Sequence, residues 1–291
     1  MVEDKSIGSK IFNFTNLFLL TLIALVTIIP FIHVIASSFT TSAELADKKF
    51  VLIPTEWSLD AYRYIFSTDT IFRALMVSVV VTLGGTLWSM FLSTLTAYGL
   101  SRKDLVGRRF FMFFVVFTLL FNGGMIPTFL VVKYTGLLDS LLSLIIPVSI
   151  NAFNMIILKS FFQNLPDSLE DAAKIDGCND FGILFRVVIP CSLPAIATIS
   201  LFYAVTYWNT YMHAILYIND PAKWPVQVLL RQIVVLASGL NYDGNEFTDV
   251  PPPEITVKMA VIVVATLPVL LVYPFLQKYF AKGALLGSVK E

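Results

Sequence analysis

The sequence predicts an all-helical (all-α) integral membrane protein with six transmembrane helices. Its 291 residues are 57% apolar and 14% charged, and they include 25 phenylalanines, whereas soluble globular domains carry roughly 25% charged residues. Long uncharged runs recur along the chain, and about 20 apolar residues are enough to cross the hydrocarbon core of a bilayer. The formal net charge is zero, so no basic face indicates nucleic acid as a partner. We therefore expect a multi-pass protein surrounded by the lipid bilayer.

Charged residues mark the limits of the six predicted spans. These spans are 13–36, 74–101, 110–132, 140–158, one within 187–219, and 259–277. The first run is too long to be the apolar core of a cleaved signal peptide, which has only about 7 to 15 residues. With both chain ends in the cytosol, twelve of the 20 Lys and Arg residues lie inside and eight lie outside, which is the direction that the positive-inside rule requires.

Two longer stretches are expected on the external side. The segment 37–70 is mixed and polar, and it predicts an external loop with a short surface helix near residues 59–66. After the fifth span, residues 224–239 predict an interfacial helix, and the run Val250-Pro251-Pro252-Pro253 cannot be helical. The sequence contains no internal repeat, so one membrane domain is expected.

The most polar interior segment, which lies between the fourth and fifth spans, predicts a folded unit of two helices. Asp167 is expected to cap the first helix with Glu170 three residues later, a capping-box pairing. Gly177 is expected to end this helix in the left-handed conformation after about three turns. Ala172 and Ala173 at its centre let another surface approach closely. The residues that share a face with them are Leu169 and Asp176, and a charged rim is formed by Glu170, Asp171 and Lys174.

A second short helix is expected to follow, with Asn179 or Asp180 as its cap. Pro190 is expected to end it. Its narrow apolar stripe falls at i, i+3, i+4 and i+7 and consists of Phe181, Leu184, Phe185 and Val188. The whole unit is expected to sit in a groove of another protein.

The absence of certain residues limits the possible energy source. None of the six uncharged runs contains Asp, Glu, Lys or Arg, and this disfavours coupling to protons or sodium ions, which need such ligands near the membrane midplane. No Gly-x-x-x-x-Gly-Lys-Ser/Thr loop is present to bind ATP phosphates. Energy for uphill transport would therefore enter from another polypeptide. Composition alone fits a passive pore or a membrane scaffold equally well.

Polar residues within the spans predict a ligand class. The fifth span carries hydroxyl groups at helical spacing, on Tyr203, Thr206, Tyr207, Thr210 and Tyr211. Asn151 and Asn154 lie one turn apart in the fourth span, and Asn122 precedes a Gly-Gly pair in the third. Amides and hydroxyls beside aromatic rings suit a neutral polyhydroxylated ligand. The same residues also fit helix packing or interfacial anchoring.

The polar segment resembles the EAA loop of binding-protein-dependent ABC importer permeases. That pattern is Glu-Ala-Ala, three residues, Gly, nine residues, Ile, any residue, Leu-Pro, and here it is matched by Asp171-Ala172-Ala173, Gly177, and Val187 to Pro190 with the spacing intact. Asp171 replaces the usual Glu, with Glu170 beside it. The sequence therefore leaves open which carboxylate has the role of the family's glutamate.

Residues from about 70 to 280 are similar to the carbohydrate branch of these permeases, the maltose-type subunit without a large external domain. Permeases for complex oligosaccharides are similar in four segments, which are Asn122 to Thr128, Gly136 to Asp139, Leu201 to Asn209, and Tyr217 to Asp220. The resemblance implies a type I ABC importer permease fold. The implied regions are 1–36, a cytosolic N-terminus with the first transmembrane helix; 37–70, an external loop; 71–280, the transmembrane domain with a coupling loop at 163–190; and 281–291, a cytosolic tail.

The resemblance also implies a mechanism and its partners. An extracytoplasmic binding protein delivers an oligosaccharide to a heterodimer of homologous permeases in the bacterial inner membrane, and two ATP-binding cassette subunits, which use ATP and Mg, drive alternating access. No cofactor is expected on this chain. The residues expected at the ATPase are Glu170, Asp171, Ala172, Ala173, Asp176, Gly177, Phe181 and Pro190. Those expected along the substrate path are Asn122, Asn151, Asn154, Tyr203, Tyr207, Trp208, Asn209 and Tyr211.

Two positions on this path rest on different arguments. The family's Trp-Asn pair, here Trp208 and Asn209, lies near its translocation path, whereas a helical wheel places Trp208 to one side of the Tyr203 stripe. We therefore expect both the Trp208-Asn209 pair and the tyrosines of the Tyr203 stripe to lie along the substrate path.

Two other functions are alternatives. A permease for amino acids or peptides is disfavoured, because no intramembrane cation is present for a carboxylate. An intramembrane enzyme needs a nucleophile with a base or a metal cluster. His33 and His213 are isolated, and Cys178 and Cys191 fit no zinc spacing. No catalytic site and no metal site are therefore expected.

Overall fold

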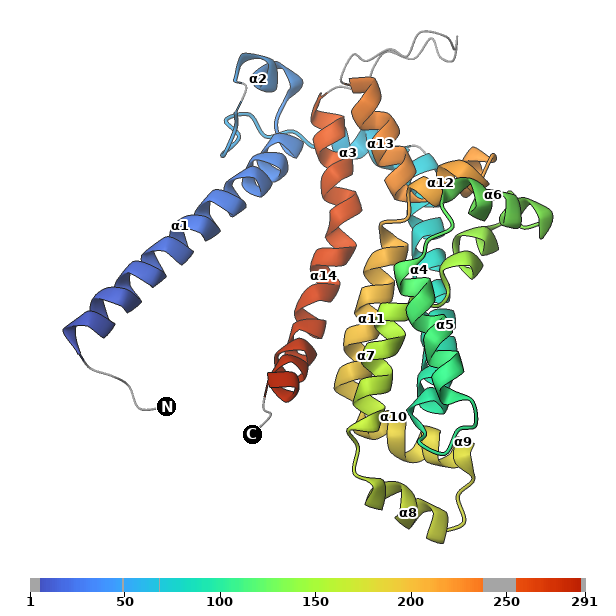
Figure 1. Ribbon diagram of the computed structural model, residues 1–291. Helices are drawn as coiled ribbons and strands as arrows, with labels where there is room; N and C mark the ends of the chain where they lie inside the picture. Colours follow the sequence, from blue (N-terminus) through green and yellow to red (C-terminus); the bar gives the residue numbers. More distant parts are fainter. Residues whose placement is uncertain (1–5, 49, 68, 238–254, 289–291) are drawn as a thin grey trace. The chain divides into compact units, whose positions relative to one another are not determined.

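The computed structural model describes residues 6–48, 50–67, 69–237 and 255–288 (Figure 1), and its regular elements are helices. An isolated bridge joins Thr40 to Trp57. The elements are α1 (Ile7–Ser38), α2 (Ser42–Asp47), α3 (Asp60–Ser67), α4 (Asp69–Ser101), α5 (Arg108–Leu120), α6 (Met125–Tyr134), η1 (Leu141–Leu144), η2 (Ile146–Val148), α7 (Ala152–Gln163), α8 (Asp167–Ile175), α9 (Asp180–Ile183), η3 (Leu184–Val188), α10 (Ile189–Cys191), α11 (Leu193–Trp208), α12 (Met212–Tyr217), η4 (Pro221–Lys223), α13 (Val226–Ala237) and α14 (Ile255–Ser288).

In the described chain, three helices are long and apolar enough to cross a membrane, and there are up to six such stretches if each of three bent helix pairs is counted as one span. Three are single helices, namely α1, α4 and the part of α14 from Ile255 to Val272. The other three are bent pairs, with bends of 117° between α5 and α6, 53° between the η1–η2 turns and α7, and 86° between the α9–α10 run and α11. Each predicted span corresponds to one of these stretches. The predicted third span is interrupted between α5 and α6, at the Gly123-Gly124 pair.

The break in the third span follows from its sequence. Gly124 has φ +91°, a left-handed backbone conformation that favours glycine. The side-chain oxygen of Asn122 accepts a hydrogen bond from the Gly124 N–H at 2.8 Å, so the turn satisfies its own backbone. The predicted fourth span begins with two 3₁₀ turns, and α7 extends five residues beyond the expected end at Leu158.

The chain divides into two compact units, residues 1–69 with 230–266, and residues 70–229 with 267–291. In the first unit, α3 confirms the predicted surface helix near residues 59–66, and the helix α2 was not predicted. The Glu44 carboxylate of α2 organises the loop after α1, because it accepts hydrogen bonds from the hydroxyls of Thr40 and Thr55, both at 2.6 Å, and from the backbone N–H of Glu56 at 3.0 Å. These bonds hold the pKa of Glu44 well below its usual range.

In the second unit, α4 packs against α11 along a row of small residues. Gly85, Ser89, Ser93 and Ala97 are spaced four apart and are buried. Small residues at this spacing let two membrane helices approach closely. The predicted helix within 224–239 corresponds to α13, although Ser238 and Gly239, like the Val250 to Pro253 run, lie outside the described residues.

Candidate functional site

The polar segment between α7 and α11 forms the predicted helical unit. Its first helix, α8, has nine residues, which is about two and a half turns. Gly177 ends it with φ +77°. The Gly177 N–H donates to the Lys174 carbonyl at 3.0 Å, and the Cys178 N–H donates to the Ala173 carbonyl at 2.9 Å. This double closure is the Schellman motif, so the predicted role of Gly177 in ending the helix is confirmed.

The predicted capping box at the start of α8 is wrong. Pro166 occupies the cap position without a side-chain bond, and Asp167 lies in the first turn of the helix. The carboxylate of Asp167 accepts a hydrogen bond from Lys103 at 3.1 Å, and Glu170 forms an ion pair with Arg102. Both carboxylates still lie near the positive end of the helix dipole. The two cations that follow α4 therefore bind the side chains that the sequence assigned to the cap.

The second helix is capped as predicted but continues further. The side-chain oxygen of Asn179 accepts a hydrogen bond from the Gly182 N–H at 2.8 Å. Pro190 was expected to end the helix, and the α9–α10 run ends one residue later, at Cys191, before the 86° bend into α11. The predicted stripe is also divided. Leu184 and Val188 are buried, whereas Phe181 is 65% and Phe185 53% exposed.

A π-helical turn lies within the predicted stripe. The expected stripe assumed α-helical spacing throughout, but η3 bonds each residue to the fifth one along and is therefore wider. This rotates the following side chains relative to an α-helix. Ile183 joins the two buried members of the stripe on the inward side.

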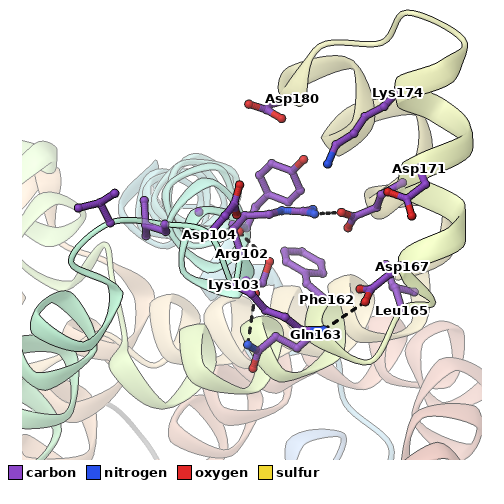
Figure 2. Close-up of a pocket in the computed structure, with 16 residues that line it drawn as sticks. Arg102, Lys103, Asp104, Phe162, Gln163, Leu165, Asp167, Asp171, Lys174 and Asp180 are labelled. Carbon is purple, nitrogen blue, oxygen red and sulfur yellow. Dashed lines mark hydrogen bonds and ion pairs between the residues drawn. The ribbon is translucent and has the colours of Figure 1, made fainter.

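A pocket of about 730 Å³ opens between the C-terminal end of α4 and α8 (Figure 2). Arg102 extends toward α8, and its guanidinium carbon lies 4.1 Å from the centroid of the Tyr98 ring. The Arg102 side chain is 22% exposed and that of Glu170 is 14% exposed. The neighbouring Lys103–Asp167 pair is 76% and 79% exposed. The first pair is thus largely shielded from water, and the second is a surface pair.

The same end of α4 is attached to two further helices. The Leu100 carbonyl accepts a hydrogen bond from the Arg108 side chain of α5 at 3.0 Å. The Ser101 carbonyl accepts one from the Gln163 side-chain amide of α7 at 3.3 Å. These donors satisfy carbonyl groups that the last turn of a helix leaves without partners. The end of α4 is therefore a junction of α4, α5, α7 and α8.

The outward side of α8 and α9 is partly apolar. Ile175 is 86% exposed and Phe181 65% exposed, and Asp171, Ala172, Asp176, Gly177 and Pro190 are exposed as well. Ala173 is different, because it is only 7% exposed and packs in a buried cluster with Leu158 and Phe162 of α7. The expectation that both alanines face another surface is therefore wrong for Ala173.

The tyrosines expected on the substrate path lie between helices. The hydroxyl of Tyr203 is 2.7 Å from the Ser93 hydroxyl and accepts a hydrogen bond from the Asn151 N–H at 3.0 Å. The hydroxyl of Tyr207 is 2.7 Å from the Ser89 hydroxyl and donates to the Ile145 carbonyl at 3.3 Å. Both rings are at most 2% exposed. In this chain the two hydroxyls join α11 to α4 and to the segment around α7.

The other expected path residues occupy several places. Asn151 is exposed and caps α7 by accepting from the Asn154 N–H at 3.1 Å, and Asn154 is buried. Asn122 is exposed in the break between α5 and α6, and Asn209 is exposed at the end of α11. Trp208 is 6% exposed and lines an apolar cavity of about 240 Å³ with residues of α4 and α14, and Tyr211 is half-buried. The eight residues thus differ in burial and in the groups that they contact.

A polar contact joins two of the four segments that resemble oligosaccharide permeases. These are the segment from Gly136 to Asp139 and the segment from Tyr217 to Asp220. Asp139, with φ +58°, accepts hydrogen bonds from the backbone N–H groups of Asn219 at 3.2 Å and Asp220 at 3.1 Å. Its backbone carbonyl accepts from Lys223 at 2.8 Å. The N–H group of Asp220 first of all, and also the Lys223 ammonium and the N–H group of Asn219, hold the pKa of the Asp139 carboxyl below its ordinary value. The contact uses the Asp139 side chain, whereas Asn219 and Asp220 take part through their backbone N–H groups.

The sequence analysis missed the residues that pair with Glu170 and those that contact Tyr203 and Tyr207. The sequence analysis assigned no role to Arg102 or to the small residues of α4. The four-residue spacing of Gly85, Ser89, Ser93 and Ala97 is the signal that could have found the contact with α11. Among the described residues, no group of three or more His, Cys, Asp or Glu side chains could hold a metal ion.

Comparisons with known proteins agree with this arrangement. The family "Binding-protein-dependent transport system inner membrane component" matches residues 85–285. The chain is 69% identical to the polygalacturonan/rhamnogalacturonan transport system permease protein YtcP of Bacillus subtilis, covering 97% of this chain and 99% of that protein. It is 50% identical to the protein LplC of Bacillus subtilis, covering 97% and 96%.

A solved structure shares the fold. The crystal structure of a bacterial ABC transporter involved in the import of the acidic polysaccharide alginate contains a chain that is 33% identical, with a TM-score of 0.87 and coverage of 96% of this chain and 100% of that one. Together with the family match, this establishes the all-helical permease fold. The chain belongs to the family of binding-protein-dependent transport system inner membrane components, and it is therefore a membrane permease subunit of an ABC importer and not an enzyme.

Proposed function

We propose that the chain is one half of the translocation path of an importer for oligosaccharides that derive from an acidic polysaccharide. The observation that carries this proposal is the 69% identity, over 97% of the chain, to a permease named for polygalacturonan and rhamnogalacturonan. The structural relative is named for alginate, which is also acidic. The proposed substrate therefore carries carboxylates in addition to the hydroxyls that the sequence analysis expected.

The proposed topology follows the sequence expectation. Residues 1–36 contain the cytosolic N-terminus and the first transmembrane helix, residues 37–70 an external loop, residues 71–280 the transmembrane domain with a coupling loop at 163–190, and residues 281–291 a cytosolic tail. The six stretches that are long enough to span a membrane support this division. The proposed location is the inner membrane of a bacterium.

The outward side of α8 and α9 is the proposed contact with a partner ATPase. Ile175 and Phe181 are large apolar side chains that remain exposed, and exposed apolar groups beside charges are typical of protein interfaces. Glu170 is held by Arg102, whereas Asp171 is exposed and has no ion pair among the described residues. Asp171 is therefore the carboxylate that we assign to the ATPase, and Glu170 is assigned to this chain's own structure.

The other proposed partners supply what this chain lacks. A homologous second permease completes the path, an extracytoplasmic binding protein delivers the saccharide, and two ATP-binding cassette subunits bind ATP and Mg. Along the path, the exposed amides of Asn122, Asn151 and Asn209 offer N–H donors to carboxylates and hydroxyls. Tyr203 and Tyr207 are buried and join α4 to α11, the helix that ends at Asn209.

Uptake by the reconstituted complex tests the proposal. Proteoliposomes that contain both permeases and the ATPase are supplied with the binding protein and a labelled oligogalacturonate. We expect ATP-dependent uptake that unlabelled oligogalacturonates inhibit and that neutral maltooligosaccharides do not. Inhibition by amino acids or peptides, with no effect of any saccharide, would overturn the proposed substrate class.

A further inference from the structure

We propose that the Arg102–Glu170 ion pair transmits the displacement of α8 to α4, which makes Arg102 a positioning residue for transport. This inference rests on the proposed function, in which an ATPase moves α8. It goes further by naming the contact through which that movement enters the transmembrane helices. The Arg102–Glu170 pair is called the inner link below.

The first argument is the sparse packing of α8. Of its nine residues, only Ala173 is buried. A helix with a broad apolar face pushes its neighbours directly, because packed interiors deform little. With one small buried side chain, α8 has few such contacts. Its movement therefore passes through the packing of Ala173, through α9 and η3, which follow α8 in the chain and contact it, and through polar links to other helices.

The second argument distinguishes the inner link from the neighbouring Lys103–Asp167 pair. Both pairs join the segment after α4 to α8, and Figure 2 labels Arg102, Lys103 and Asp167 of these pairs. The Lys103–Asp167 side chains are more than three-quarters exposed, and such surface pairs are weak and screened by salt. The inner link is mostly shielded from water, so it is screened less.

The third argument is that Arg102 is itself fixed to α4. Its guanidinium carbon lies 4.1 Å from the centroid of the Tyr98 ring, one helical turn earlier. Stacking on an aromatic face restricts the planar guanidinium group. A force on Glu170 therefore reaches the body of α4 through Arg102 instead of being absorbed by rotation of a free side chain.

The fourth argument is what α4 contacts further along. Ser89 and Ser93 of α4 bond the hydroxyls of Tyr207 and Tyr203 on α11. Displacement of α4 therefore acts on α11, the helix that ends at Asn209. The inner link thus stands at the start of a continuous set of contacts from α8 to the helices of the proposed path.

The test uses the complete reconstituted complex and measures three quantities. These are the amount of bound ATPase, the basal rate of ATP hydrolysis, and the rate in the presence of the binding protein loaded with oligogalacturonate. In Arg102→Gln we expect ATPase binding and basal hydrolysis to stay within about twofold of wild type. Stimulation by the loaded binding protein and saccharide uptake should both fall by about fivefold or more, which is the size of a typical coupling between sites.

Two further variants control for charge and for folding. Lys103→Gln removes the exposed pair and should leave stimulation within about twofold of wild type. The exchange of charges in Arg102→Glu with Glu170→Arg should recover part of the stimulation that either single substitution loses. Partial rescue identifies the pair itself, because a general loss of structure is not repaired by a second substitution.

The outcomes are distinct. An Arg102→Gln complex that assembles and keeps wild-type stimulation overturns the inference. Loss of bound ATPase in both Arg102→Gln and Glu170→Gln also overturns it. The pair would then only keep α8 and α9 in the conformation that binds the ATPase. A wild-type complex that no saccharide stimulates contradicts the proposed function instead, whereas a stimulated wild type beside an equally stimulated Arg102→Gln contradicts the inference alone.

Discussion

A side-chain carbon added to Gly85 would lie 2.7 Å from the nearest atoms of the Tyr207 ring, closer than real carbon atoms approach. Gly85 is buried on α4, and Tyr207 is almost fully buried on α11. The Tyr207 hydroxyl then reaches Ser89, one turn further along α4. The absence of a side chain at Gly85 therefore sets how closely the two helices approach.

Replacement of Gly85 by Ala should destabilise the protein by about 1–3 kcal/mol, because the ring of Tyr207 or the whole of α11 must shift. The measurement is the thermal unfolding midpoint of the purified protein in detergent. Gly84→Ala is the matched control, since its added carbon would meet only the Ile145 side chain, at an ordinary 3.9 Å. Equal midpoints for the two variants would show that α4 and α11 do not meet through Gly85.

Replacement of Tyr203 by Phe removes the hydroxyl that bonds Ser93 and leaves the Asn151 N–H without its acceptor. We expect a loss of about 0.6–2 kcal/mol of stability, the usual range for hydrogen bonds between membrane helices. The same unfolding measurement tests this, and Tyr134→Phe is the control because Tyr134 is 84% exposed. An increased KM for the saccharide with unchanged stability would instead place the Tyr203 hydroxyl in contact with the substrate.

The sequence was sufficient to predict the spans because uncharged length alone identifies them. It also predicted Gly177 correctly and gave Asn179 as one of two possible caps, since left-handed ends and caps are decided by neighbouring backbone groups. It failed for Asp167 and Glu170, whose partners Lys103 and Arg102 are more than 60 residues away. Local pattern cannot show which of two competing partners a carboxylate takes when one of them comes from a distant segment.

The positions of the path residues were harder to predict for a related reason. Tyr203 and Tyr207 were correctly grouped on one side of a helix, but periodicity does not show what lies opposite that side. The serines and glycine of α4 decide it, because small residues allow α4 to cover both rings. The turn of η3 could not be predicted either, since a π-helical turn has no strong sequence signal and depends on packing.

Asp139 gives a prediction about pH. Its pKa is lowered from 3.8 by the hydrogen bonds from Asp220 and Asn219 and by Lys223. A carboxylate whose pKa falls on folding stabilises the folded state above its ordinary pKa, and this contribution is lost as the pH falls through the lower value. The unfolding midpoint of Asp139→Asn should therefore lie below that of wild type at neutral pH, and the difference should shrink as the pH is lowered below about 4.

Asn is the suitable replacement at position 139 because it tolerates the left-handed backbone that Asp139 adopts with φ +58°. The substitution therefore removes the charge without adding backbone strain. Asp60→Asn is the control, since the Asp60–Arg63 pair is about 80% exposed and contributes little. A difference between wild type and Asp139→Asn that stays constant from pH 7 to pH 3 would contradict an ionised Asp139 as the source of the stability.

Gly177 gives the most direct test of whether the end of α8 takes part in binding the ATPase. Its φ of +77° disfavours any residue with a side chain, yet an added carbon would meet nothing within 4 Å. Gly177→Ala should therefore weaken the closure of α8 by about 1–2 kcal/mol through the backbone alone. Gly177→Asn should weaken it less, because Asn enters the left-handed region more easily. Titration of the permease pair with the ATPase subunit measures the effect as a change in Kd.

The variant with the larger rise in Kd shows whether Gly177 acts through its backbone conformation or through direct contact with the ATPase. If the backbone decides, Kd rises more for Gly177→Ala than for Gly177→Asn. If the ATPase surface contacts Gly177 directly, the larger Asn side chain should be the more harmful one. Gly99→Ala is the control, because Gly99 lies within α4 with no atom within 4 Å of an added carbon, and it should leave Kd unchanged. Unchanged Kd in both Gly177 variants would mean that this end of α8 takes no part in binding the ATPase.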